Sequence, residues 1–164
     1  MTPCDRPLPD LEIPMINTMV TCLGSEHRKL NDLTMKLAFA ATRLASDPES
    51  VPARQQALEA WDEIRHDLWP HLQIEDELVL TWGEKHHAIP DALLATLKVE
   101  HEETRRLLAA LPELPSSIDR EPPMIEDGAA FARNLQALAC TLDSHVERYD
   151  GEVLPSILRA LFHK

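Results

Sequence analysis

The segment Ala57–Trp82 reads ALEAWDEIRHDLWPHLQIEDELVLTW, and its pattern decides the fold of the chain. Apolar side chains recur along it every three or four residues, which is the period of one face of an amphipathic helix. Two polar residues, His71 and Glu75, occupy positions on this apolar face where leucine is the ordinary choice. The segment therefore predicts a helix that packs against other helices and directs an imidazole and a carboxylate into their core.

Three further segments have the same apolar period: Ile16–Leu44, Leu94–Leu111 and Phe131–Ile157. In each of them a histidine takes one apolar position: His27, His101 and His145. A single buried histidine is most often only a hydrogen-bonded core residue. Four histidines at similar positions on four helices indicate one constellation instead, and it is the main functional signal of the sequence.

Proline, glycine and serine separate the four predicted helices. Ser46-Asp47-Pro48 ends the first helix, and Ser50 is the expected N-cap of the second, with Pro52 in its first turn. The other boundaries are Gly83–Ile89, Pro90-Asp91, Pro112 with Pro115, and a fourth start near residue 127. Because short connections make neighbouring helices antiparallel, we predict an all-α, up-down-up-down antiparallel four-helix bundle with a metal site in the core. We expect residues 1–11 to be a poorly structured leader and residues 12–164 to form the bundle.

The composition limits the classes of function. Hydrophobic residues make up 44% of the chain, as in globular proteins, and the net charge is −12 at pH 7. An acidic surface repels phosphate groups, so we expect neither a nucleic-acid partner nor docking on anionic membranes. The N-terminus lacks the apolar run of a signal peptide and no segment could span a bilayer, which predicts a cytoplasmic protein. The sequence is compatible with a homodimer.

Counting residues from the predicted helix ends places the histidines at one height. His27 and His71 each lie about 19 residues, roughly 28 Å, from the connection between their helices. Glu75 and His101 each lie about 11 residues, roughly 16 Å, from the next connection. His145 lies about 18 residues into the fourth helix, roughly 27 Å. We therefore expect the four imidazoles near one cross-section of the bundle.

Imidazole and carboxylate ligands suit iron, manganese or zinc, and the three cysteines form no CxxC pair that would indicate structural zinc. Four histidines with two carboxylates exceed the needs of one tetrahedral ion, so two octahedral ions fit better, with Glu75 bridging them. On the fourth helix, Tyr149 is about 40° from His145 and Asp150 about 140°. A π-bulge eased by Gly151 would turn Asp150 inward, and we prefer Asp150 as the ligand because a carboxylate can bridge. Tyr149 is then an outer group or an alternative ligand.

These residues resemble the hemerythrin family and its bacterial hemerythrin-like (HHE cation-binding) relatives over nearly the whole chain. The matching positions are His27, His71-x-x-x-Glu75, His101 and His145-x-x-x-x-Asp150. The resemblance implies a four-helix bundle with a non-haem di-iron centre, held by His27, His71, Glu75, His101, His145 and Asp150. It also implies O2, NO or peroxide as the small ligand. One ion, or another divalent metal, is the alternative to two iron ions.

The chain departs from the family pattern at Arg105, where a second histidine of the third helix is expected. Arginine stays protonated and cannot bind a cation. The change either leaves an open coordination position or weakens the binding of the second ion until only one ion binds. As a third option, Arg105 pairs with Glu102 or with a bridging carboxylate. The departure weakens the case for reversible oxygen carriage of the marine-worm kind.

Three functions follow from these observations. The first is a di-iron protein that binds O2 or NO, or senses or stores iron, without being a turnover enzyme. The second is a stress-repair protein that donates iron or handles peroxide or NO. The third is a metal-free interaction bundle, which would leave several buried polar groups unpaired at a cost of about 1–3 kcal/mol each.

Overall fold

The computed structural model describes residues 12–112 and 125–162, and within them every regular element is helical, with no strand. This arrangement is consistent with a four-helix bundle. The predicted leader, residues 1–11, lies outside the described residues. The elements are α1 (Glu12–Ser46), α2 (Val51–Ile74), η2 (Glu75–Leu80), α3 (Thr81–Lys85), α4 (Asp91–Ala109), α5 (Gly128–Arg148), η3 (Tyr149–Val153) and α6 (Leu154–Phe162).

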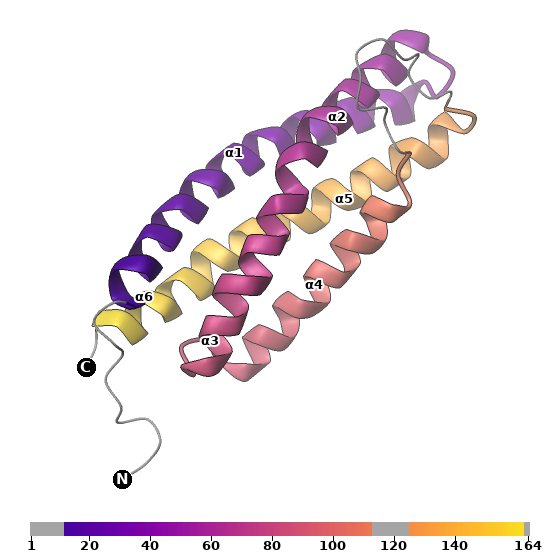
Figure 1. Ribbon diagram of the computed structural model, residues 1–164. Helices are drawn as coiled ribbons and strands as arrows, with labels where there is room; N and C mark the ends of the chain where they lie inside the picture. Colours follow the sequence, from indigo (N-terminus) through magenta and orange to yellow (C-terminus); the bar gives the residue numbers. More distant parts are fainter. Residues whose placement is uncertain (1–11, 113–124, 163–164) are drawn as a thin grey trace.

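The long helices lie side by side along one axis (Figure 1). The short connection between α1 and α2 lies at one end of the molecule, and that between α3 and α4 at the other. α1 packs against α2 and α5, and α4 packs against α5. Among the described helices, none has both the length and the apolar character that crossing a membrane requires.

The helix starts agree with the residues that predicted them. The Ser50 side chain accepts a hydrogen bond from the backbone N–H of Ala53 at 3.3 Å, so the predicted N-cap of α2 is confirmed. Asp127 caps α5 in the same way, accepting from the N–H of Ala130 at 2.8 Å. α4 begins at Asp91, directly after Pro90, as expected.

The core consists of two apolar clusters that meet the histidines from opposite sides. On α1, Leu23 belongs to one cluster and Leu30 to the other, and His27 lies between them in the chain. On α5, His145 lies between Leu142 of one cluster and Tyr149 of the other. The histidines therefore form a polar layer between two dry leucine-rich layers, where bulk water has little access.

Two π-helical segments, η2 and η3, directly follow α2 and α5, the helices that carry His71 and His145. The wider turn of η2 changes which residues face the core. Leu78, which the regular period places inside, is 39% exposed, whereas Val79 and Leu80 are buried. The apolar face that a regular period predicts for Ala57–Trp82 is therefore wrong at Leu78, because the 3.6-residue period does not hold through η2.

Candidate metal centre

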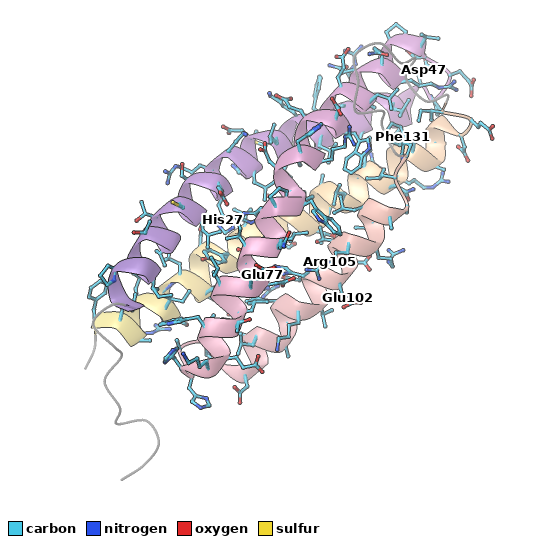
Figure 2. The ribbon with its side chains drawn as sticks, viewed as in Figure 1. His27, Asp47, Glu77, Glu102, Arg105 and Phe131 are labelled. Carbon is cyan, nitrogen blue, oxygen red and sulfur yellow. The ribbon has the colours of Figure 1, made fainter. Side chains whose placement is uncertain are left out.

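The four predicted histidines come together in the interior of the structure. All four are buried, and they come from α1, α2, α4 and α5. The ring centroids of His27 and His71 are 4.8 Å apart, and those of His101 and His145 are 5.1 Å apart. Figure 2 shows His27 in the central part of the molecule, away from both helix ends.

Glu75 lies at the centre of this group. It is the first residue of η2, and its side chain is only 2% exposed. Its Oε1 is 3.2 Å from Nε2 of His27. Its Oε2 is 3.1 Å from Nε2 of His101 and 3.1 Å from Nε2 of His145, and 3.6 Å from Nε2 of His71. The Nε2 atoms of all four rings therefore face one buried carboxylate.

Several of these facing atoms have no hydrogen-bond partner among the described residues. They include Oε2 of Glu75 and Nε2 of both His101 and His145, although the atoms are only 3.1 Å apart. A buried polar atom without a partner costs about 1–3 kcal/mol. One ligand atom from each of His27, His71, Glu75 and His145 can be chosen so that all lie within 4.8 Å of one another. Unpaired nitrogen and carboxylate atoms converging in this way fit a bound cation.

The electrostatics of the group favour a charged carboxylate. Burial alone would raise the pKa of Glu75, but the neighbouring His145 and close contacts with His101 and His27 hold this pKa well below its usual range. Burial lowers the pKa of His71, and the charge of Glu75 only partly opposes it. For His101, burial would lower the pKa, but contacts with Glu75 and Asp76 outweigh it and raise the pKa.

The two candidate ligands of the fourth helix, Asp150 and Tyr149, lie differently in the structure. Asp150 has a side chain that is 56% exposed, and its Oδ1 lies 3.6 Å from the outer nitrogen, Nδ1, of His27. Tyr149 is buried, with its ring centroid 4.3 Å from that of His27. The expected π-helical turn exists, but it begins only at Tyr149. Regular α-helix therefore extends from His145 to Arg148, which keeps Tyr149 on the inner face and Asp150 outside.

The hydroxyl of Tyr149 is buried and has no hydrogen-bond partner among the described residues. Burial, reinforced by the negative charges of Glu75 and Asp150, raises the pKa of this phenol. Tyr149 is thus a neutral phenol in the present arrangement. The structure turns Tyr149, and not Asp150, toward the site.

The acidic side chains that surround the histidines could not be predicted from the sequence. Asp76 Oδ1 accepts from Nδ1 of His101 at 2.7 Å, and Glu26 Oε2 lies 3.2 Å from Nδ1 of His71. Asp76 appeared in the sequence only as part of an acidic run, Glu75-Asp76-Glu77. A spacing rule within one helix could not find these partners, because each pair joins two different helices.

Arg105 provides no ligand and pairs with Asp76. Neither partner proposed from the sequence, Glu102 or a bridging carboxylate, holds it in the structure. Figure 2 labels both Arg105 and Glu102 on the α4 side of the molecule. The guanidinium of Arg105 therefore lies one layer outside the histidines and is linked to the site through Asp76.

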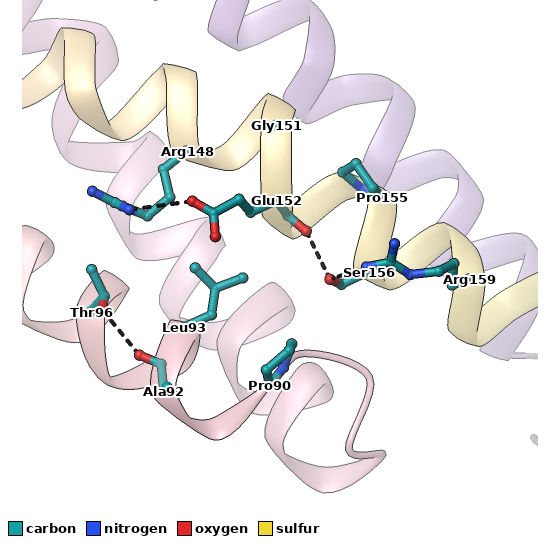
Figure 3. Close-up of a pocket in the computed structure, with 10 residues that line it drawn as sticks. All are labelled: Pro90, Ala92, Leu93, Thr96, Arg148, Gly151, Glu152, Pro155, Ser156 and Arg159. Carbon is teal, nitrogen blue, oxygen red and sulfur yellow. Dashed lines mark hydrogen bonds and ion pairs between the residues drawn. The ribbon is translucent and has the colours of Figure 1, made fainter.

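A surface pocket of about 430 Å³ lies beside η3. Figure 3 shows it between the start of α4, at Pro90 and Leu93, and the side chains of Arg148 and Glu152 on the facing helix. Gly151 lines it as well, next to Asp150 in the chain. The histidines and Glu75 do not line this pocket.

The comparison with known families agrees with the spacing of these residues. The Hemerythrin HHE cation binding domain matches residues 18–157, which include all four histidines and Glu75. No curated protein and no solved structure matches the chain. Since the match covers most of the 164 residues, the chain belongs to the hemerythrin HHE cation-binding family.

Proposed function

We propose that this chain is a non-haem di-iron protein that binds a small oxygen- or nitrogen-containing molecule: O2, NO or a peroxide. The proposal rests on Glu75, a fully buried carboxylate whose two oxygens face imidazole nitrogens from four helices. We infer an up-down-up-down order of these helices around the site. The histidines that would serve as terminal ligands through Nε2 are His27, His71, His101 and His145.

Glu75 is suited to bridge two ions because its oxygens face different partners. Oε1 is closest to His27, whereas Oε2 is closest to His101 and His145. Family membership supports a cation at this position. Iron supplies the coordination of diatomic molecules and the change of oxidation state, while the surrounding leucines exclude water from the polar layer.

The remaining ligand comes from η3, and two residues compete for the role. Asp150 is the residue that matches the family pattern, but its carboxylate lies on the exposed side of His27. Tyr149 is turned inward in the structure. In the iron(III)-loaded protein, a bound phenolate gives a visible charge-transfer band. Tyr149→Phe should abolish such a band if Tyr149 is the ligand, and Asp150→Asn should lower iron stoichiometry if Asp150 is.

Metal analysis together with an optical spectrum tests the proposal. After anaerobic reconstitution with iron(II), we expect two iron ions per chain and near-ultraviolet bands that change on adding azide, NO or O2. One ion per chain would replace the di-iron centre by a single-ion site, for which His27, His71, Glu75 and His145 form a compact set. Less than about one ion per chain would overturn metal binding altogether and leave a metal-free interaction bundle.

Binding and turnover can be separated with the same protein. Helix α4 contributes one imidazole, that of His101, because an arginine at position 105 cannot ligate a cation and pairs with Asp76 instead, and we infer an open coordination position beside His101. Rapid consumption of peroxide or NO over many cycles would favour a stress-handling protein, and transfer of iron to an iron-free acceptor would favour iron donation. We expect one binding event per site and no sustained turnover.

A further inference from the structure

Every histidine of the polar layer has an acidic side chain near its outer nitrogen, Nδ1. The distances from Nδ1 to the nearest carboxylate oxygen are 2.7 Å for His101 and Asp76, 3.2 Å for His71 and Glu26, 3.6 Å for His27 and Asp150, and 4.0 Å for His145 and Glu100. The first two pairs are within hydrogen-bonding distance. Because all four Nε2 atoms point to Glu75, each ring lies between an inner carboxylate and an outer one.

Two of the four outer carboxylates are held by arginines. Arg105 pairs with the second oxygen of Asp76, and Nε of Arg148 donates to Glu100 at 2.8 Å. The other two acids, Glu26 and Asp150, are more exposed, and no arginine or lysine contact involves them in the described part of the chain. The support of the histidines is therefore unequal: of the four rings, only that of His101 has an outer carboxylate that is both within hydrogen-bonding distance and held by an arginine.

The contact between His101 and Asp76 has a direct chemical consequence. A neutral imidazole that donates its Nδ1 proton to a carboxylate must keep its lone pair on Nε2, the atom that faces Glu75. An Asp76 side chain free to rotate would hold this tautomer only part of the time. Arg105 pairs with the second oxygen of Asp76 and so restricts this rotation, since a guanidinium retains its charge and its donor geometry.

We propose that Arg105 is a positioning residue, which acts through Asp76 to hold His101 as the Nδ1-protonated tautomer with Nε2 free for a cation. The residue that replaces the expected histidine of the family pattern thus serves the site from one layer outside it. Arg148 and Glu100 form a similar arrangement beside His145. It is looser, because Oε2 of Glu100 lies 4.0 Å from Nδ1 of His145. The proposal rests on the proposed function in so far as Nε2 is the metal-binding atom.

The first test needs no metal. Long-range proton–nitrogen correlation spectra of the metal-free, ¹⁵N-labelled full chain report which ring nitrogen carries the proton. At about pH 9, where imidazoles are neutral, we expect His101 to be the Nδ1–H tautomer in the wild-type protein. Arg105→Gln should shift its signals toward a mixture of tautomers, and Asp76→Ala should shift them further. Arg106→Gln is the matched control, because Arg106 is the next residue and, among the described residues, pairs with Glu103 and not with Asp76.

The second test measures zinc affinity by competition with a chelator. We expect Asp76→Ala and Arg105→Gln to weaken zinc binding roughly 10–100-fold, the usual effect of losing an outer partner of a ligating histidine. Arg105→Lys, which keeps the charge, should retain more affinity than Arg105→Gln, and Arg106→Gln should change it less than about twofold. These variants alter partly exposed side chains, and thermal unfolding checks that each one folds.

The two tests separate the proposals from each other. If the wild-type chain binds no zinc and no iron, the proposed function fails, and the tautomer of His101 still decides the role of Arg105. If Arg105→Gln matches Arg106→Gln in the spectra, the positioning role is overturned, whatever the chain binds. If Arg105→Gln changes the spectra but leaves the zinc affinity unchanged, Arg105 fixes the tautomer without supporting metal binding. That result also overturns the proposal.

Discussion

At the scale of single residues, Glu75 determines what the polar layer can do. It is the inner partner of all four histidines, and its pKa is held well below the usual range even though burial opposes this. Glu75→Gln keeps the shape of the side chain but removes its charge and one acceptor oxygen. We expect iron and zinc affinity to fall at least on the order of 100-fold, since loss of even an outer partner costs 10–100-fold.

Glu77→Gln is the matched control for this prediction. Glu77 belongs to the same π-helical segment but is exposed, and it accepts a hydrogen bond from Gln73 at 2.9 Å. Equilibrium dialysis against iron(II) or zinc should give wild-type stoichiometry for Glu77→Gln and a clear deficit for Glu75→Gln. Equal metal content in the two variants would mean that Glu75 is not a ligand.

The dependence of metal binding on pH should follow His101. Its pKa is raised, because contacts with Glu75 and Asp76 outweigh burial, so its proton persists to higher pH than that of a free imidazole. The pKa of His71 is lowered, mainly by burial, so the His71 ring is already neutral at the pH where His101 loses its proton. A cation must displace the His101 proton, and affinity should fall as pH decreases through the raised pKa, by up to about tenfold per pH unit.

Zinc competition between about pH 6 and 8, corrected for protonation of the chelator, measures this dependence. Asp76→Asn removes one of the interactions that raise the pKa of His101, so the fall in affinity should move to lower pH. An affinity that is independent of pH over this range would show that no imidazole proton is displaced, and would contradict His101 as a ligand.

At the scale of elements, the junction between the first connection and α5 depends on a small residue. An ideal Cβ built on Gly128 would lie 2.3 Å from the backbone oxygen of Pro48, which also accepts a hydrogen bond from Arg54 at 2.7 Å. We expect Gly128→Ala to destabilise the fold by about 1–3 kcal/mol, the usual cost of overpacking. Gly24→Ala is the control, because its Cβ meets no atom within 4 Å.

Urea unfolding followed by circular dichroism measures both variants. Gly24 lies inside α1, where alanine favours helix over glycine by about 0.5–1 kcal/mol, so Gly24→Ala should be neutral or stabilising. A Gly128→Ala protein as stable as Gly24→Ala would contradict the close approach of α5 to Pro48.

The elements also show which features the sequence could predict. Helix starts followed from local signals such as Ser50, and the common height of the histidines followed from counting a regular rise of 1.5 Å per residue. Counting fails where the helix is not regular. η2 exposes Leu78, and η3 begins too late to turn Asp150 inward. Asp76 escaped prediction for another reason: its partners, His101 and Arg105, lie on a different helix, and their pairing depends on how α4 packs.

At the scale of the whole molecule, we expect the polar layer to couple metal binding to stability. It separates two apolar clusters, and its unpaired buried atoms weaken the metal-free fold at its centre. A cation that binds the folded chain and not the unfolded chain stabilises the fold by about 2.7 kcal/mol when its free concentration is near 100 times Kd. For a chain of this size, each kcal/mol corresponds to about 2–4 °C, so Tm should rise by roughly 5–10 °C.

Differential scanning calorimetry with and without zinc tests this coupling. The rise in Tm should grow with the logarithm of zinc concentration in the wild-type protein, because stabilisation follows RT ln(1 + [L]/Kd). Glu75→Gln, at the same zinc concentration, should show a much smaller rise, since its Kd is larger. A rise of equal size in Glu75→Gln would place the stabilising zinc elsewhere, on the acidic surface that gives the chain its net charge of −12. The polar layer would then be stable without a cation, and its unpaired atoms would need another partner.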